Sequence, residues 1–211
     1  MRPRPRLIAI AGGSGSGKSW LAHGLARRLG HGATVLELDR FYRDRSHLSR
    51  TRADRLNFDH PRALDWRLFH RLLGRMLRGH PVEVPRYNYL THERFFDSQR
   101  LAPGRWILVE GVWALRSREV RRQLWLGIYL ECSIKTRLAR RLARDAQERR
   151  LPLKSVLSQF RRQVQPMHRR FVAPQRRNAH LIVHSPVAPS TLRRIVGCLH
   201  GTATDAPPTV L

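Results

Sequence analysis

The sequence contains little cysteine and no long apolar segment. Among 211 residues only Cys132 and Cys198 are present, which excludes a disulfide framework and a cysteine-based metal cluster. No uninterrupted apolar run approaches the ~20 residues that a membrane helix needs. The apolar stretch after the arginine-rich start, residues 7–11, is also shorter than the apolar region of a secretory signal. We therefore expect a cytoplasmic protein that does not span a membrane.

Acidic residues are scarce as well, and lysine is nearly absent. The 41 Lys and Arg outnumber the 15 Asp and Glu, which gives a formal net charge of +26 at pH 7. Lysine occurs only at positions 18, 135 and 154, so the excess is arginine, and it is spread along the chain. We expect nonspecific, salt-sensitive adhesion to nucleic acids, although the charge does not establish this as the main function. The 41% hydrophobic and 27% charged content is that of a folded globular protein.

Short apolar strands alternate with helical segments along the chain. Expected strands lie at residues 7–11, 34–38, 106–110, 126–130 and 181–183, with an irregular or edge strand at 82–89. Expected helices lie at residues 18–29, 62–78, 117–124, 135–149 and 153–169. This alternation predicts an α/β fold with a doubly wound, mostly parallel sheet and a ligand at the carboxyl ends of the strands.

The residues after the first expected strand form a phosphate-binding loop. The motif comprises Gly12, Gly13, Ser14, Gly15, Ser16, Gly17, Lys18 and Ser19. It satisfies the pattern G-x-x-x-x-G-K-[ST] and lies between a strand and a helix, as this loop requires. Backbone N–H groups are expected to surround the phosphates, with Lys18 at the β- and γ-phosphates and the Ser19 hydroxyl on Mg²⁺. The sequence therefore predicts binding of a nucleoside triphosphate.

Two other kinds of phosphate-binding site fit less well. Asp39 lies 21 residues after Lys18, where a dinucleotide-binding protein has a ribose-binding acid. The loop lacks the G-x-G-x-x-G spacing of such proteins, however, and they do not need Lys18 and Ser19. None of the asparagines, at positions 57, 88 and 178, begins a guanine-binding N-K-x-D motif. A kinase or an ATPase remains.

Two acids are expected at the ends of strands that face this loop. Asp39 ends the second strand and Glu110 ends the strand at 106–110, so both carboxylates are candidates to orient a nucleophile or hold a metal ion. Asp39 has the alternatives of a helix N-cap or an ion-pair partner of Arg40 or Arg43. For Glu110 the alternative is a buried residue in a turn.

Several further blocks occur in the order that one family shows. They are Leu38–Tyr42, Asn57–Pro61, Pro85–His92, Val109–Gly111, Arg137–Asp145, Gln159–Phe160 and Pro166–His168. With the phosphate-binding loop, these blocks span residues 7–184, and in them the sequence resembles the uridine kinase family of P-loop nucleoside kinases, which includes phosphoribulokinase-like enzymes. The resemblance implies one P-loop kinase domain at residues 1–200 with a lid at about 137–152, and we expect a disordered tail at 201–211.

The resemblance also implies an activity and the parts that perform it. The reaction is phosphorylation of the 5′-hydroxyl of uridine or cytidine in pyrimidine salvage, with ATP or GTP as the donor and Mg²⁺ as the cofactor. Asp39 matches the family's catalytic base, assisted by Lys18. The magnesium ion is expected at Ser19, Asp39 and Glu110. Homotetramers are common among similar kinases.

The resemblance implies that a second group of residues binds the nucleoside. Asp59 matches the carboxylate that binds the ribose hydroxyls, and Tyr87 and His92 match residues at the pyrimidine edge; Gln159 is a further substrate-site candidate. On sequence alone Asp59 has the alternative of a helix N-cap, and a loop histidine such as His92 is usually just solvated.

Arginines at helical spacing are expected in the lid. Arg137, Arg140, Arg141 and Arg144 share one helical face, which predicts an exposed charged stripe with Leu138 and Leu142 turned to the core. In the family this helix leads into a lid, and the resemblance implies that Arg141, Arg144 and Arg149 close over the transferred phosphate, with Arg141 and Arg149 also at the substrate.

Two positions depart from the family pattern. Asn88 replaces an aspartate between two aromatic residues, and the lid sequence Arg149-Arg150-Leu151 replaces Arg-Gly-Arg. Leu151 keeps open a P-loop kinase of another alcohol, such as nicotinamide riboside, pantothenate or a sugar phosphate. The net charge keeps open an arginine-rich ATPase or nucleic-acid-binding protein.

Overall fold

A five-stranded parallel sheet forms the centre of the molecule. The computed structural model describes residues 4–49, 56–149 and 151–201. The strands in spatial order are β2 (Ala33–Glu37), β5 (Trp106–Glu110), β1 (Arg6–Gly12), β6 (Leu124–Glu131) and β7 (Leu181–His184). Every neighbouring pair is parallel. The predicted α/β class is confirmed, and all the carboxyl ends of these strands share one edge.

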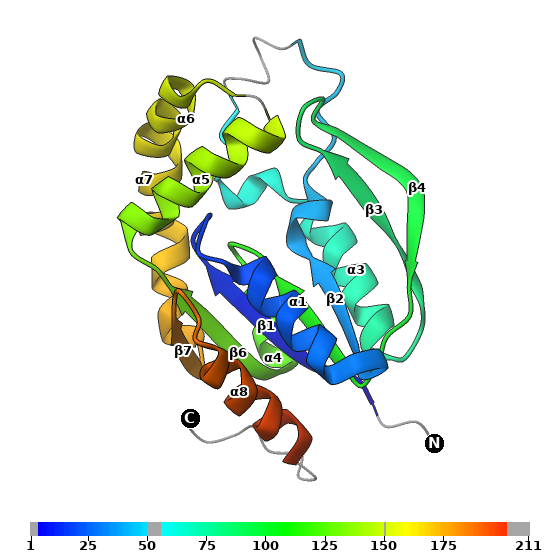
Figure 1. The fold of residues 1–211 in the computed structure, drawn as a ribbon. Helices are drawn as coiled ribbons and strands as arrows, with labels where there is room; N and C mark the ends of the chain where they lie inside the picture. The colour runs from blue at the N-terminus through cyan, green and yellow to red at the C-terminus, as the bar shows by residue number, and fades with distance from the viewer. Residues whose placement is uncertain (1–3, 50–55, 150, 202–211) are drawn as a thin grey trace.

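Helices cover both faces of this sheet, because the buried side chains of β1 alternate between them (Figure 1). Ile8 and Ile10 pack with α1 (Lys18–Leu29) and with α8 (Pro189–Gly201). Leu7 and Ala9 point the other way, into a core shared with α3 (Trp66–Leu77). Helix α8 was not predicted from the sequence.

The helix α3 begins later than the sequence predicts. A 3-10 turn, Pro61–Ala63, precedes it, and the carboxylate of Asp65 accepts the backbone N–H of Leu68 as the N-cap. An N-cap side chain satisfies an N–H group that the first turn leaves open, so the helix starts after Asp65. Asp59 is therefore not the cap of this helix.

An antiparallel hairpin stands apart from the central sheet. The predicted edge strand is β3 (Val82–Asn88), and it pairs with β4 (Glu93–Leu101), which the sequence did not reveal. The Asn88 Oδ1 accepts the backbone N–H groups of Leu90 and Thr91, at 2.8 and 3.3 Å. The side chain that departs from the family pattern thus closes the turn of the hairpin.

The lid helices lie across the carboxyl ends of the strands from the hairpin (Figure 1). They are α5 (Ile134–Arg149) and α6 (Leu153–Gln159), followed by α7 (Gln165–Met167) between the π-helical stretches Phe160–Val164 and His168–Val172. A 3-10 segment, Ala173–Asn178, leads to β7. The single helix predicted at 153–169 is thus interrupted by wider turns, which occur often at functional sites.

Two smaller predictions can be compared with the structure. The short helix between β5 and β6 is present as α4 (Arg118–Arg122), with Ser117 as its N-cap. The strand β2 ends at Glu37, and Asp39 lies in the 3-10 turn Leu38–Phe41 that follows it, not at the strand end. Of the predicted tail, residues 202–211 lie outside the described residues, and Gly201 ends α8. Within the described ranges, no helix combines the length and the apolar character needed to cross a membrane.

Candidate active site

The phosphate-binding loop connects β1 to α1 in a conformation that requires glycine. Gly15 and Gly17 have φ angles of +78° and +96°, which L side chains rarely adopt. A Cβ on Gly15 would also lie 2.5 Å from the backbone oxygen of Arg137 in the lid helix. The backbone conformation and the close packing against Arg137 therefore both require glycine here, as the motif predicts.

Lys18 is buried at the start of α1. Its Nζ donates to the backbone oxygen of Gly13 at 3.2 Å, so the ammonium lies within the turn of the loop. Burial lowers the pKa of Lys18, and the carboxylates of Glu110 and Asp39 act against this shift. The two predicted acids are therefore close enough to stabilise the cation electrostatically.

Glu110 and Ser19 form the polar pair expected of a magnesium site. The Ser19 hydroxyl donates to Glu110 Oε1 at 2.8 Å. Glu110 ends β5 and lies beside Ile10 of β1 and Glu37 of β2 in the sheet register. Burial raises the pKa of Glu110, while the Lys18 charge lowers it. A hydroxyl and a carboxylate oxygen that meet beside the phosphate loop are the hard oxygen donors that Mg²⁺ prefers.

Asp39 faces the same space as Ser19 and Glu110. A cavity of about 530 Å³ has among its lining residues Ser19, Asp39, Tyr87, Tyr89, Glu110 and Arg144. The Tyr89 hydroxyl donates to Asp39 Oδ2 at 3.2 Å. Arg40, a suggested partner of Asp39, instead donates to Glu37. The fold thus brings three predicted acid and hydroxyl groups to one cavity, although they are far apart in the sequence.

Two of the residues predicted for the nucleoside, Tyr87 and His92, belong to an aromatic group near Asp39. The His92 ring stacks on Phe58 with centroids 4.3 Å apart, and its Nδ1 lies 3.3 Å from the Tyr87 hydroxyl. Tyr42 lies among them: burial, followed by the negative charges of Asp39 and Asp59, raises the pKa of its hydroxyl well above the ordinary value. Tyr87 lines the cavity, whereas Asp59 and His92 lie beyond its described lining.

The lid arginines are tied to the phosphate loop. Arg141 donates to Ser14 Oγ at 3.1 Å and to Gln159 Oε1 at 2.8 Å. Arg144 lines the cavity and donates to the buried carboxylate of Asp145. Gln159 therefore contacts a lid arginine. Arg149 is the last residue of α5, and its side chain lies outside the described part of the structure.

The predicted orientation of the lid helix is wrong. Arg137 and Arg141 are 1% and 6% exposed, whereas Leu138 and Leu142 are only half-buried. The reason is that this helix packs against the phosphate loop and the next helix, which present polar groups. Arg137 donates to Gln165 Oε1 at 2.8 Å and lies over the ring of Phe160.

Comparison with known proteins agrees with this arrangement. The model of the phosphoribulokinase / uridine kinase family matches residues 7–191. The chain belongs to this family. It is 37% identical over 181 residues to a uridine kinase of Deinococcus deserti, covering 85% of this chain and 87% of that protein. It is 38% identical over 178 residues to a uridine kinase of Staphylococcus haemolyticus, covering 84% and 86%.

Among solved structures, the phosphoribulokinase of Rhodobacter spheroides has a TM-score of 0.63 at 16% identity, covering 86% of this chain and 70% of that one. At this identity the likeness concerns the fold alone. Membership of the phosphoribulokinase / uridine kinase family, on a P-loop fold, implies a phosphotransferase that uses an ATP-type nucleotide and a hydroxyl acceptor.

Four residues of the candidate active site were not predicted from the sequence. Tyr42 and Tyr89 belong to the family blocks at 38–42 and 85–92, so a signal for them was available in the sequence. Arg137 and His168 surround Gly13 from the lid side, within 3 Å of where its Cβ would lie. Both residues also belong to family blocks, at 137–145 and 166–168, but no spacing rule indicated that their side chains pack behind the loop.

Proposed function

We propose that this protein transfers a phosphoryl group from ATP to the 5′-hydroxyl of uridine or cytidine. The observation that carries the proposal is the cavity in which Asp39 and Tyr87 share a lining with Ser19 and Glu110. Two relatives named uridine kinase match 85% and 84% of this chain, which supports a pyrimidine nucleoside as the acceptor.

The phosphate loop supplies the donor site. Its backbone N–H groups and Lys18 bind the phosphates of ATP, or of GTP as an alternative donor. The pair of Ser19 and Glu110 fits a magnesium ion, with Asp39 as a third proposed group. When bound, Mg²⁺ neutralises charge on the phosphates.

Asp39 acts on the acceptor. Its carboxylate accepts the proton of the attacking hydroxyl while the oxygen bonds to the γ-phosphorus and the nucleoside diphosphate leaves. The Tyr89 hydroxyl, 3.2 Å from Oδ2, holds the carboxylate in place. Lys18, Arg141 and Arg144 offset the charge on the transferred group.

The remaining predicted residues recognise the nucleoside. Asp59 accepts hydrogen bonds from the ribose hydroxyls, and Tyr87 and His92 contact the pyrimidine. Gln159 holds Arg141, and Arg149 approaches the substrate when the lid closes. These roles rest on the family resemblance and on the aromatic group around Tyr42.

Leu151 favours a second candidate acceptor. Its side chain offers no hydrogen bond where the family lid has an arginine, so another alcohol, such as nicotinamide riboside, pantothenate or a sugar phosphate, stays a candidate. The chemistry at Asp39 is the same for each of these alcohols.

A panel of acceptors with ATP and Mg²⁺ tests the proposal. We expect turnover with uridine or cytidine to exceed turnover with the other alcohols, because only a nucleoside offers both a diol and a pyrimidine. ATP turnover that no alcohol stimulates would overturn kinase function and favour the ATPase or nucleic-acid-binding alternative. Stimulation only by a different alcohol would overturn the nucleoside assignment.

The substitution Asp39→Asn separates catalysis from folding. It should lower kcat by roughly 10²–10⁴-fold, because a positioned general base contributes about that factor, and leave ATP binding largely intact. Glu83→Gln removes the same charge from an exposed site on β3 and should have wild-type activity. Equal loss of ATP binding and turnover in Asp39→Asn would make the residue structural.

Assembly and location are further proposals. The family resemblance supports a homotetramer in the cytoplasm, and light scattering of the purified chain measures its molecular mass directly. A mass of one 24.6 kDa chain would contradict the tetramer.

A further inference from the structure

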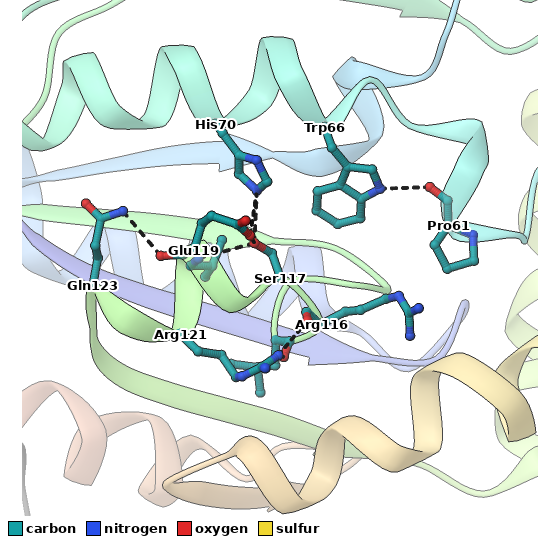
Figure 2. Close-up of polar contacts among 10 residues, drawn as sticks. Pro61, Trp66, His70, Arg116, Ser117, Glu119, Arg121 and Gln123 are labelled. Carbon is teal, nitrogen blue, oxygen red and sulfur yellow. Dashed lines mark hydrogen bonds and ion pairs between the residues drawn. The ribbon is translucent and has the colours of Figure 1, made fainter.

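A second cavity lies outside the candidate active site. It has a volume of about 490 Å³ and is bounded by α3, by the loop before α4 and by the segment that leads into β7 (Figure 2). Trp66 and His70 project into this region from α3, and Arg116 and Ser117 face them from the loop. None of the residues that line the candidate active-site cavity lines this one. The volume is within the range of small-molecule sites, about 300–1,000 Å³.

Positive charge dominates the walls of this cavity. Arg116, Arg121 and Arg177 line it, with Glu119 as the acid. Glu119 accepts the Ser117 hydroxyl at 2.7 Å and lies 3.8 Å from His70 Nε2. Within the described ranges, none of the three guanidinium groups forms an ion pair with a carboxylate. The cavity therefore has an excess of positive charge, which an anionic ligand would neutralise.

The guanidinium of Arg116 is held in an orientation suited to a phosphate. Its central carbon lies 4.9 Å from the centroid of the Phe171 ring, so the planar group is supported on an aromatic surface. A supported guanidinium loses less conformational freedom when its N–H groups bind a phosphate in a forked geometry. Arg177 supplies a second cation to the same cavity.

Trp66 supplies a flat apolar wall. Its indole N–H donates to the backbone oxygen of Pro61 at 2.9 Å, which fixes the ring in the position that Figure 2 shows. Aromatic faces stack on nucleobases without regard to sequence. The cavity thus offers a surface for a planar base and cations for phosphates, which are the two parts of a nucleotide.

We infer that this cavity is a second nucleotide site, with the phosphates bound by Arg116 and Arg177 and the base placed against Trp66. It is separate from the phosphate loop and does not depend on the identity of the acceptor. The site borders the proposed acceptor segment, since Trp66 is bonded to Pro61 and the ring of Phe171 lies 4.8 Å from that of His60.

Calorimetric titration with CTP tests the inference. The wild-type protein should bind two equivalents, one at the phosphate loop and one at the second cavity. Lys18→Ala weakens the loop site and should leave one equivalent. Adding Arg116→Gln and Arg177→Gln to that variant should weaken the remaining equivalent by roughly 100-fold, since two charged donors are lost.

A matched pair controls for net charge. Arg118→Gln and Arg122→Gln remove the same two charges from exposed positions of α4 outside the cavity and should retain the remaining equivalent. Equal weakening by both pairs, or no CTP bound by Lys18→Ala, would overturn the inference. If the double variant unfolds, Arg177→Gln alone, at an exposed position, should weaken CTP by roughly tenfold.

Other probes distinguish the ligand class. Trp66→Leu should weaken CTP at this site roughly tenfold and leave inorganic tripolyphosphate unaffected, because the loss concerns stacking alone. Tripolyphosphate that binds the cavity as tightly as CTP would overturn the nucleotide assignment. Binding of an RNA oligonucleotide without any binding of CTP would instead make the surface a nucleic-acid contact.

Discussion

Asp145 holds Arg141 one helical turn away inside the lid. Its Oδ2 lies 3.2 Å from Arg141 Nε, and its Oδ1 accepts from Arg144 at 2.9 Å. The Asp145 side chain is fully buried. A single carboxylate therefore orients both arginines that we assign to the transferred phosphate.

Asp145→Asn should reduce phosphoryl transfer more than it reduces substrate binding. The amide retains the shape but not the charge, so Arg141 and Arg144 lose their fixed geometry. We expect kcat to fall roughly 10–100-fold, since one lost electrostatic contact costs about that factor or more, with a smaller change in KM for ATP. Steady-state kinetics measure both quantities.

Glu131→Gln is the matched control for Asp145→Asn. Glu131 also pairs with an arginine, Arg176 at 3.3 Å, but on the surface, where ion pairs contribute little. Its kinetics should match those of the wild-type protein. A wild-type kcat in Asp145→Asn would show that the lid arginines do not need this carboxylate.

Arg137→Met tests the buried cation behind the phosphate loop. Arg137 is 1% exposed, and its Nε and Nη1 have no hydrogen-bond partner among the described residues. Because Nη1 lies 2.4 Å from where a Cβ on Gly13 would be, the guanidinium supports the loop directly. We expect KM for ATP to rise roughly tenfold with little change in kcat. The loss of one contact made by a charged group changes binding by about this factor. Lys135→Gln, exposed on the same helix, should leave KM unchanged.

The stability of the fold should decrease in mild acid because of His168. Burial, followed by the charges of Arg137 and Lys18, lowers the pKa of His168 from 6.5 to about 4. Between these two values the unfolded chain binds a proton at this site and the folded chain does not, so the free energy of unfolding decreases as pH falls. The full loss is up to about 3 kcal/mol, from about 1.4 kcal/mol for each pH unit.

Urea unfolding of His168→Gln at pH 7 and pH 4.5 checks this prediction. The variant should lose less stability than the wild-type protein between the two values. His80→Gln, at an exposed position before β3, should behave as the wild-type protein does. Identical acid sensitivity of wild type and His168→Gln would contradict the prediction.

Of two glycine-to-alanine substitutions, one should weaken ATP binding and the other should raise the stability of the fold. Gly15→Ala places a Cβ 2.5 Å from the Arg137 backbone oxygen at a φ of +78°, so ATP binding should weaken at least tenfold as the loop is displaced. Gly197→Ala lies on α8 with no atom within 4 Å of the new Cβ and should raise stability by about 0.5–1 kcal/mol. Nucleotide titration and thermal unfolding measure the two effects.

Local rules explain what could be predicted for the fold. The buried strands, the phosphate loop and α1 follow from apolar runs and glycine positions, which act over a few residues. Helix α8 was missed, because its formation depends on packing against α1, which is distant in the sequence. Strand β4 directly follows β3 in the chain, but its residues Glu93–Leu101 carry no regular alternation of apolar and polar side chains that would have marked a strand.

The sequence alone determined which residues we propose for the chemistry: Lys18, Ser19, Asp39 and Glu110 follow from the motif and from the order of the blocks. Only the tertiary structure decided which side of helix α5 is buried. Periodicity placed Arg137 and Arg141 on a solvent-exposed face, yet both are buried: Arg141 contacts Ser14 of the phosphate loop and Asp145, and Arg137 contacts Gln165 and Phe160 of the following segment. A pattern along one helix records spacing and not the polarity of the surfaces that pack against it, and those surfaces come from other segments, the phosphate loop 127 residues before Arg141 and the helix that follows.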